Sequence, residues 1–138
     1  MSPSQPRVGG FNQYLGLRIV EYEEGRCVME LPVEERHLNR SGIVHGGVLA
    51  TLVDAATSHA GNHAPEVENR PRSVTVAMSI QYLGQAKKGP LRAVGTRTGG
   101  GRSMFFSRAE VFDAEGTLVA VGDMTGKRLV RPPRDRDD

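Results

Sequence analysis

One carboxylate stands among apolar and small residues in a helical pattern. Asp54 lies inside residues 46–62, where the spacing of apolar side chains predicts a helix. Aspartate has a poor helix propensity and is costly to bury without a partner. A carboxylate at such a position is a candidate nucleophile or general base, and the plain alternative is a structural contact between two chains.

The residues that share the Asp54 side of this helix are all small. At about 100° per residue, that side also holds Ala50, Thr51, Thr57, Ser58 and Gly61. The opposite side is expected to face the core and carries Val48, Leu49, Leu52, Ala56 and His59, with Val53 on the flank. We therefore expect a trough of small side chains around the carboxylate, with room for a ligand or for another backbone.

A pair of glycines at the predicted helix start offers a second kind of chemistry. Gly46 and Gly47 follow His45, and the N–H groups of a first helical turn have no partner inside the helix. Together with the helix dipole, such groups bind an oxygen atom that becomes negative. The helix start is therefore a candidate oxyanion site for a carbonyl substrate.

The candidate oxyanion site and the carboxylate are too far apart to act together within one chain. Asp54 follows Gly46 by eight residues, which is ~12 Å along a helix. A single carbonyl carbon cannot contact both groups of the same chain. If both act on one substrate, two copies of the chain must supply them, which predicts a symmetric dimer with sites shared across its interface.

The composition is that of an ordinary globular protein. A chain of 138 residues with 38% hydrophobic and 25% charged residues is expected to form one domain with a core. A net charge of +2, with 5% aromatic residues and no Trp, is unlike that of nucleic-acid binders. The slight basic excess fits a small phosphorylated ligand better than a polymer.

The lack of a predicted membrane span or signal peptide, together with a single cysteine, favours a cytoplasmic protein. We find no apolar run long enough to span a membrane and no signal peptide. Cys27 is the only cysteine, so no internal disulfide forms, and its place in a predicted strand indicates a core position. Met78 and Met104, also on predicted strands, are expected in the core.

The order of the predicted elements indicates an α+β fold. A short helix or turn over 9–16 precedes the β-like runs 17–23 and 26–33; after the helix come the runs 73–83, 91–98, 103–113 and 117–130. One long helix with an apolar side requires a curved antiparallel sheet, here of five to six strands, to cover it. We expect a single domain over 1–130 and a disordered tail over 131–138.

Strict alternation in the run 73–83 predicts which side chains share a face. One face would carry Val74, Val76, Met78, Ile80 and Tyr82, and the other Ser73, Thr75, Ala77, Ser79 and Gln81. The second face is again small and polar.

The spacing of these residues resembles a known family. Asn39, His45-Gly46-Gly47 and Leu52-Val53-Asp54, followed by four strands, resemble the hotdog-fold acyl-CoA thioesterases of the phenylacetate-degradation (PaaI-like) type. The resemblance extends over about residues 14–129. It implies a hotdog fold, hydrolysis of an acyl-CoA thioester to the free acid and coenzyme A, and a homodimer that commonly pairs into a homotetramer. Coenzyme A is then part of the substrate, and no metal or other cofactor is implied.

The resemblance also implies a role for each matching residue. Asp54 would act as nucleophile or as general base on water, and the Gly46 N–H would bind the thioester oxygen. His45 would orient or polarise the thioester, and Asn39 would help to hold the attacking water or the carboxylate. Thr75 stands where relatives have Ser or Thr near the nucleophile.

Further residues are expected to contact the substrate. Gly47 and Ser58 lie beside the oxyanion donor and the carboxylate, where the small trough admits an aryl ring or a medium alkyl chain. Two further groups could hold the phosphates of coenzyme A: Lys87 and Lys88, and Arg102 with Ser103. The alternative is that these residues only form solvated turns. Ala55, Ala56 and Ala77 replace residues that are often polar in relatives, which indicates a different acyl pocket.

Three other functions compete with hydrolysis. A hotdog hydratase or dehydratase would pair His45 with Asp54 across the interface, but the Asn39 spacing and the His-Gly-Gly turn favour hydrolysis. A non-catalytic acyl-CoA sensor would need an added DNA-binding segment, for which residues 1–16 are expected to be too short. His59 and His63 are spaced as a metal pair, but no His-Glu-x-x-His pattern accompanies them.

Overall fold

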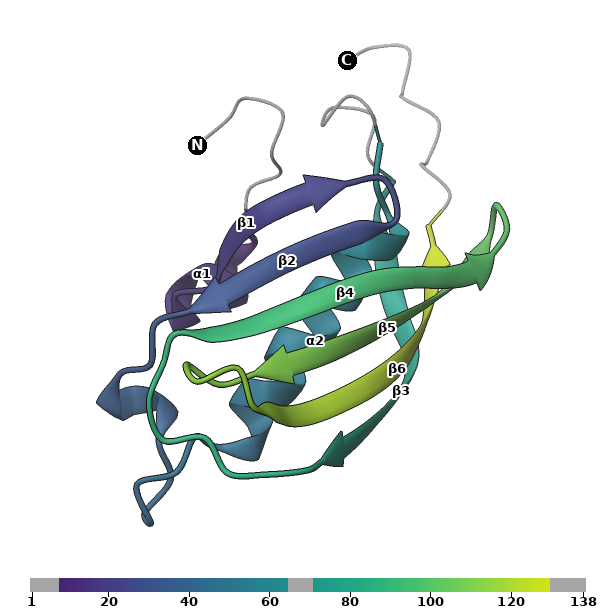
Figure 1. Ribbon diagram of the computed structural model, residues 1–138. Coiled ribbons are helices and arrows are strands. Elements are labelled where there is room, and N and C mark those ends of the chain that lie inside the picture. Colours follow the sequence, from purple (N-terminus) through teal and green to yellow (C-terminus); the bar gives the residue numbers. More distant parts are fainter. Residues whose placement is uncertain (1–7, 65–70, 130–138) are drawn as a thin grey trace, which may run out of the picture.

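The computed structural model describes residues 8–64 and 71–129, and it confirms the expected order of elements (Figure 1). The elements are α1 (Gly10–Leu15), β1 (Arg18–Glu23), β2 (Arg26–Leu31), a 3₁₀ turn (Glu35–His37), α2 (Gly46–Gly61), β3 (Ser73–Tyr82), β4 (Leu91–Gly100), β5 (Met104–Phe112) and β6 (Leu118–Arg128). The predicted tail over 131–138 lies outside the described residues.

The six strands form one antiparallel sheet that curves around α2. Their order is β1-β2-β4-β5-β6-β3, so β3 and β1 are the two edges. Figure 1 shows α2 lying across the concave side of this sheet. This is the hotdog arrangement that the resemblance implied, and it leaves the start and the middle of α2 accessible. Within the described ranges, no helix combines the length and the apolarity needed to cross a membrane.

Glycines in the sheet let α2 approach the strands closely. A Cβ atom at Gly95 of β4 would lie 2.3 Å from the carbonyl oxygen of Ala56, and one at Gly122 of β6 would lie 2.6 Å from the side chain of Val53. Leu52, Val53 and Ala56 are fully buried, as is the predicted core residue Cys27 on β2. The close packing of α2 on these strands therefore fixes the position of Asp54, which lies two residues before Ala56.

The trough around Asp54 is narrower than predicted. Thr57 is fully buried, and its hydroxyl donates to the carbonyl of Val53 at 2.6 Å. Gly61 is also buried, and a Cβ atom there would overlap the ring of Phe105. Placing Thr57 and Gly61 in the trough was therefore wrong. The residues that remain half-buried on the Asp54 side are Ala50, Thr51, Asp54 and Ser58.

Strand β3 is an edge with mostly exposed side chains. It pairs only with β6 within the described part of the chain, and Val74, Val76 and Tyr82 are about half exposed. Met78 on β3 and Met104 at the start of β5 are also exposed, so their predicted core position was wrong. An exposed apolar edge of this kind offers backbone groups for pairing with a further strand.

A β-bulge in β3 breaks the predicted alternation. The register shifts between Thr75, which pairs with Gly126, and Ala77, which pairs with Thr125. Thr75 bonds to Asp54 on α2, and Ile80 packs against the core that contains α2, although they are five positions apart. Strict alternation would place them on opposite faces, so the extra residue of the bulge brings Thr75 to the helix side.

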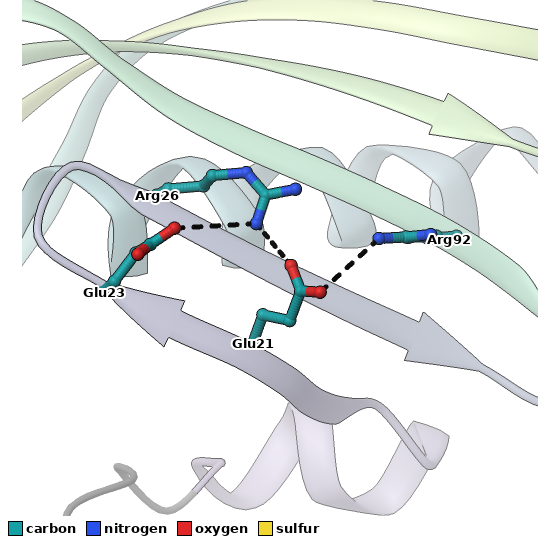
Figure 2. A network of polar contacts seen from close by, with 4 residues as sticks. All are labelled: Glu21, Glu23, Arg26 and Arg92. Carbon is teal, nitrogen blue, oxygen red and sulfur yellow. Dashed lines mark hydrogen bonds and ion pairs between the residues drawn. The ribbon is translucent and has the colours of Figure 1, made fainter.

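The opposite edge of the sheet is charged. Figure 2 shows Glu21 of β1 between the guanidinium groups of Arg26 and Arg92, with Glu23 also paired to Arg26. The hydrogen bond from Arg26 is the main cause that lowers the pKa of Glu21. Exposed ion pairs contribute little to stability, but charged side chains discourage edge-to-edge pairing. The β1 edge of the sheet is therefore charged, whereas the β3 edge is apolar and open to pairing.

Candidate active site

The start of α2 is capped by the histidine that precedes the two glycines. His45 is the N-cap residue, and its Nδ1 accepts a hydrogen bond from the Gly47 N–H at 2.8 Å. Because Nδ1 accepts, we assign the proton of the neutral ring to Nε2. The side chain is exposed, so Nε2 is a donor available to a ligand.

The N–H group of Gly46 has no acceptor within residues 8–64 and 71–129. The next donors of the first turn are satisfied, since the N–H of Gly47 bonds to the His45 ring and that of Val48 bonds to the His45 carbonyl at 2.9 Å. The helix start therefore presents one backbone donor and the nearby His45 ring, as an oxyanion site requires.

The loop before His45 is fixed by backbone bonds and by one buried side chain. The His45 N–H donates to the His37 carbonyl at 2.8 Å, and the Val44 N–H donates to the Ala86 carbonyl at 2.7 Å. The His37 ring is fully buried, and its Nε2 lies 2.7 Å from the carbonyl of Leu15. These contacts hold the loop between α1 and the segment after β3.

Asn39 shapes this loop through its side-chain oxygen. Its Oδ1 accepts from the N–H groups of Ser41 and Ile43, at 2.9 and 3.1 Å. Such a turn is a typical structural use of asparagine. The oxygen is therefore engaged, and holding a water molecule or a carboxylate would fall to the amide nitrogen.

Asp54 emerges half-buried from the middle of α2. Its Oδ1 accepts a hydrogen bond from the Thr75 hydroxyl at 2.5 Å. The structure therefore brings together two residues that the sequence had placed in one site, and Ser58 follows on the same side one turn later. The bond occupies one carboxylate oxygen, and the other has no hydrogen-bond donor within the described parts of the chain.

The residues predicted to hold the phosphates of coenzyme A lie near the two ends of α2. Lys88 is exposed in the segment after β3, two residues beyond the Ala86 that bonds to the loop before α2. Arg102 and Ser103 are exposed in the turn between β4 and β5. That turn lies by the end of α2, because Arg128 donates to the carbonyls of both Gly61 and Arg102. The 16 residues of α2 separate the two groups by ~24 Å.

Two residues near the site were missed by sequence reasoning. Arg128 caps the end of α2, with bonds to the Gly61 carbonyl at 2.6 Å and to Asn62 Oδ1 at 3.2 Å. Burial, and secondarily the charge of Arg97, lowers the pKa of its guanidinium. Tyr82 donates from its hydroxyl to the carbonyl of Gly46 at 2.9 Å. Both contacts join residues far apart in the chain, so no local pattern indicates them.

Known proteins with similar sequences include thioesterases. The profile of the thioesterase superfamily matches residues 41–120, which include the start of α2 and Asp54. Acyl-coenzyme A thioesterase 13 of Homo sapiens is 32% identical over 118 residues, covering 83% of this chain and 82% of that protein.

Solved structures of similar chains share the fold. A conserved protein from Pseudomonas aeruginosa superposes with a TM-score of 0.81 at 29% identity, covering 88% of this chain and 95% of the other. A mutant of the phenylacetic acid degradation protein PaaI from Thermus thermophilus gives a TM-score of 0.74 at 28% identity, covering 86% and 98%. With its sheet, its central helix and the matched profile, this chain belongs to the thioesterase superfamily.

Proposed function

We propose that this protein hydrolyses acyl-CoA thioesters to the free acid and coenzyme A, with Asp54 as nucleophile or general base. The observation that carries the proposal is the half-buried Asp54 carboxylate, held by Thr75 on the helix of a thioesterase fold. The similarity to human acyl-coenzyme A thioesterase 13 supports the choice of an acyl-CoA substrate.

The proposed site is shared between two copies of the chain. If Asp54 of one chain faces Gly46 of the other, two-fold symmetry requires the reverse contact as well, so the axis passes near residue 50. Ala50 and Thr51 are small and half-buried there, which permits the two helices to approach. The outer edge of β3, which pairs with no strand among the described residues, supports the same dimer, since two such edges could pair into a continuous sheet. Pairing of dimers into tetramers stays a prediction.

The chemistry then follows from the two half-sites. The Gly46 N–H and the His45 Nε2–H of one chain would bind the thioester oxygen and stabilise the charge that develops on it. Asp54 of the other chain would attack the carbonyl carbon with its free oxygen, or take a proton from an attacking water. The thiolate of coenzyme A is a fair leaving group, so less acid assistance is needed than for an amide.

The shared site also gives the basic residues a common role. Antiparallel helices would bring the β4–β5 turn of one chain, with Arg102 and Ser103, toward the Lys88 segment of its partner. Phosphate groups of coenzyme A would bind between them. The short side chain of Ser58 would leave space for an aryl or medium-chain acyl group beside Asp54.

The test is release of free thiol from phenylacetyl-, hydroxybenzoyl- and fatty acyl-CoA. We expect turnover by the wild type and a loss of about 10²- to 10⁴-fold in Asp54→Asn, because the substitution removes the base without changing the size of the side chain. Asp123→Asn, at an exposed position on β6, is the matched control and should retain activity. Full turnover by Asp54→Asn would refute the catalytic assignment, and hydration of crotonyl-CoA without hydrolysis would favour a hydratase.

A further inference from the structure

The peptide group between Gly46 and Gly47 is held at both of its polar atoms. Its carbonyl oxygen accepts from the Tyr82 hydroxyl at 2.9 Å, and its N–H donates to His45 Nδ1 at 2.8 Å. One of these bonds comes from the preceding residue and the other from the end of β3. The orientation of this peptide plane is therefore set from two independent directions.

Tyr82 also covers Gly46 with its ring. A Cβ atom at Gly46 would lie 3.4 Å from both Cζ and the hydroxyl oxygen of Tyr82, which is ordinary van der Waals contact. Two successive glycines have an unusually free backbone, since neither carries a side chain that restricts rotation. The bond from the Tyr82 hydroxyl therefore adds a restraint from outside α2 to those that the helix and its His45 cap supply.

We propose that Tyr82 is a positioning residue that fixes the direction of the Gly46 N–H. The proposal rests on the proposed thioesterase function, in which that N–H binds the oxyanion. Donors stabilise a transition state only when they are already oriented toward the atom that becomes charged. Tyr82 does not touch the thioester in this scheme, and it acts by limiting rotation of the peptide that follows the donor.

The position of Tyr82 links the two half-sites of one chain. Strand β3 carries Thr75, which holds the Asp54 carboxylate, and ends at Tyr82, which holds the helix start. One strand therefore contacts α2 at both functional points, with the bulge setting the direction of Thr75. A shift of β3 along α2 would disturb the nucleophile and the oxyanion donor together.

The experiment compares Tyr82→Phe with the wild type in thiol-release kinetics and in amide hydrogen exchange. Tyr82→Phe removes one oxygen atom and keeps the ring over Gly46, and circular dichroism verifies that it is folded. We expect kcat to fall by about 10- to 100-fold with KM changed less than about twofold, because orientation affects the transition state rather than binding. Tyr14→Phe, which removes the hydroxyl of a tyrosine 72% exposed on α1, is the matched control and should match the wild type.

Amide exchange keeps this proposal separate from the proposed function. In ¹⁵N-labelled Tyr82→Phe, the Gly47 N–H should exchange faster by about tenfold or more, while it stays unchanged in Tyr14→Phe. Faster exchange of the Gly47 N–H in a protein without thioesterase activity would support the restraint of the Gly46–Gly47 peptide by Tyr82 and would refute the proposed hydrolysis. An unchanged kcat in an active enzyme, a raised KM with unchanged kcat, or unaltered exchange of Gly47 would overturn the positioning role.

Discussion

At the residue scale, His45 has two separable tasks. Its Nδ1 caps α2 by accepting from the Gly47 N–H, and its Nε2 is the donor proposed to contact the thioester oxygen. Asparagine is among the best N-cap residues but does not reproduce a donor at the Nε2 position. The two tasks can therefore be distinguished by substitution.

We predict that His45→Asn keeps the stability and loses activity, whereas His45→Ala loses both. Removing the cap in His45→Ala should lower the free energy of unfolding by about 1 kcal/mol, whereas the asparagine in His45→Asn replaces the cap and should leave the free energy of unfolding nearly unchanged. Urea unfolding measures the stability, and kcat for thiol release measures the activity. Full activity in His45→Asn would show that the ring donor is not used, whatever the stability.

At the element scale, the position of Asp54 depends on how closely α2 lies on the sheet. Gly95 of β4 meets the carbonyl oxygen of Ala56, which is backbone and cannot rotate away as a side chain would. Added volume at this contact must move the helix or the strand. The same displacement would separate Asp54 from Thr75, because Thr75 is held by the sheet through β6.

We predict that Gly95→Ala lowers the free energy of unfolding by about 1–3 kcal/mol and also reduces turnover. The control is Gly101→Ala in the turn between β4 and β5, where no atom lies within 4 Å of the added Cβ. Thermal unfolding of both variants tests the predicted loss of stability. Equal unfolding midpoints would mean that α2 packs less closely on β4 than the structure indicates.

At the scale of the whole molecule, the proposed activity requires two chains. Gly46 and Asp54 are ~12 Å apart along one rigid helix, so motion of a loop cannot bring them together. Gly46→Pro removes the N–H donor at a position where proline is tolerated, because Gly46 is the first residue of α2. The added Cβ atom would lie 3.4 Å from the Tyr82 ring, which is an ordinary contact. The preceding His45, at φ −60° and ψ 135°, already has the extended conformation that proline favours before it.

We predict that inactive Gly46→Pro and inactive Asp54→Asn restore activity when mixed. Each mixed dimer contains one intact site, with Asp54 from one chain and Gly46 from the other, so statistical exchange should give about a quarter of wild-type turnover. The subunits are unfolded together and refolded, and each variant refolded alone is the control. Absence of restoration, with mixed dimers verified by native mass spectrometry, would place the complete site within one chain.

The sequence by itself determined the elements and the residue types of the site. The helix period around Asp54, the glycines at the helix start and the strand runs fix local structure, since they depend on neighbours within a few residues. The same spacing gave the separation of ~12 Å between Gly46 and Asp54 without any coordinates. The alternation of β3 failed because a bulge depends on the partner strand, here β6, and not on β3 alone.

Only the tertiary structure decided which groups restrain the site. The bond from Thr75 to Asp54 spans 21 residues, that from Tyr82 to Gly46 spans 36, and that from Arg128 to Gly61 spans 67. Contacts between such distant positions depend on the packing of the curved sheet against α2, which no local pattern encodes. The candidate site residues could therefore be named from the order of residues, whereas their arrangement in space required the fold.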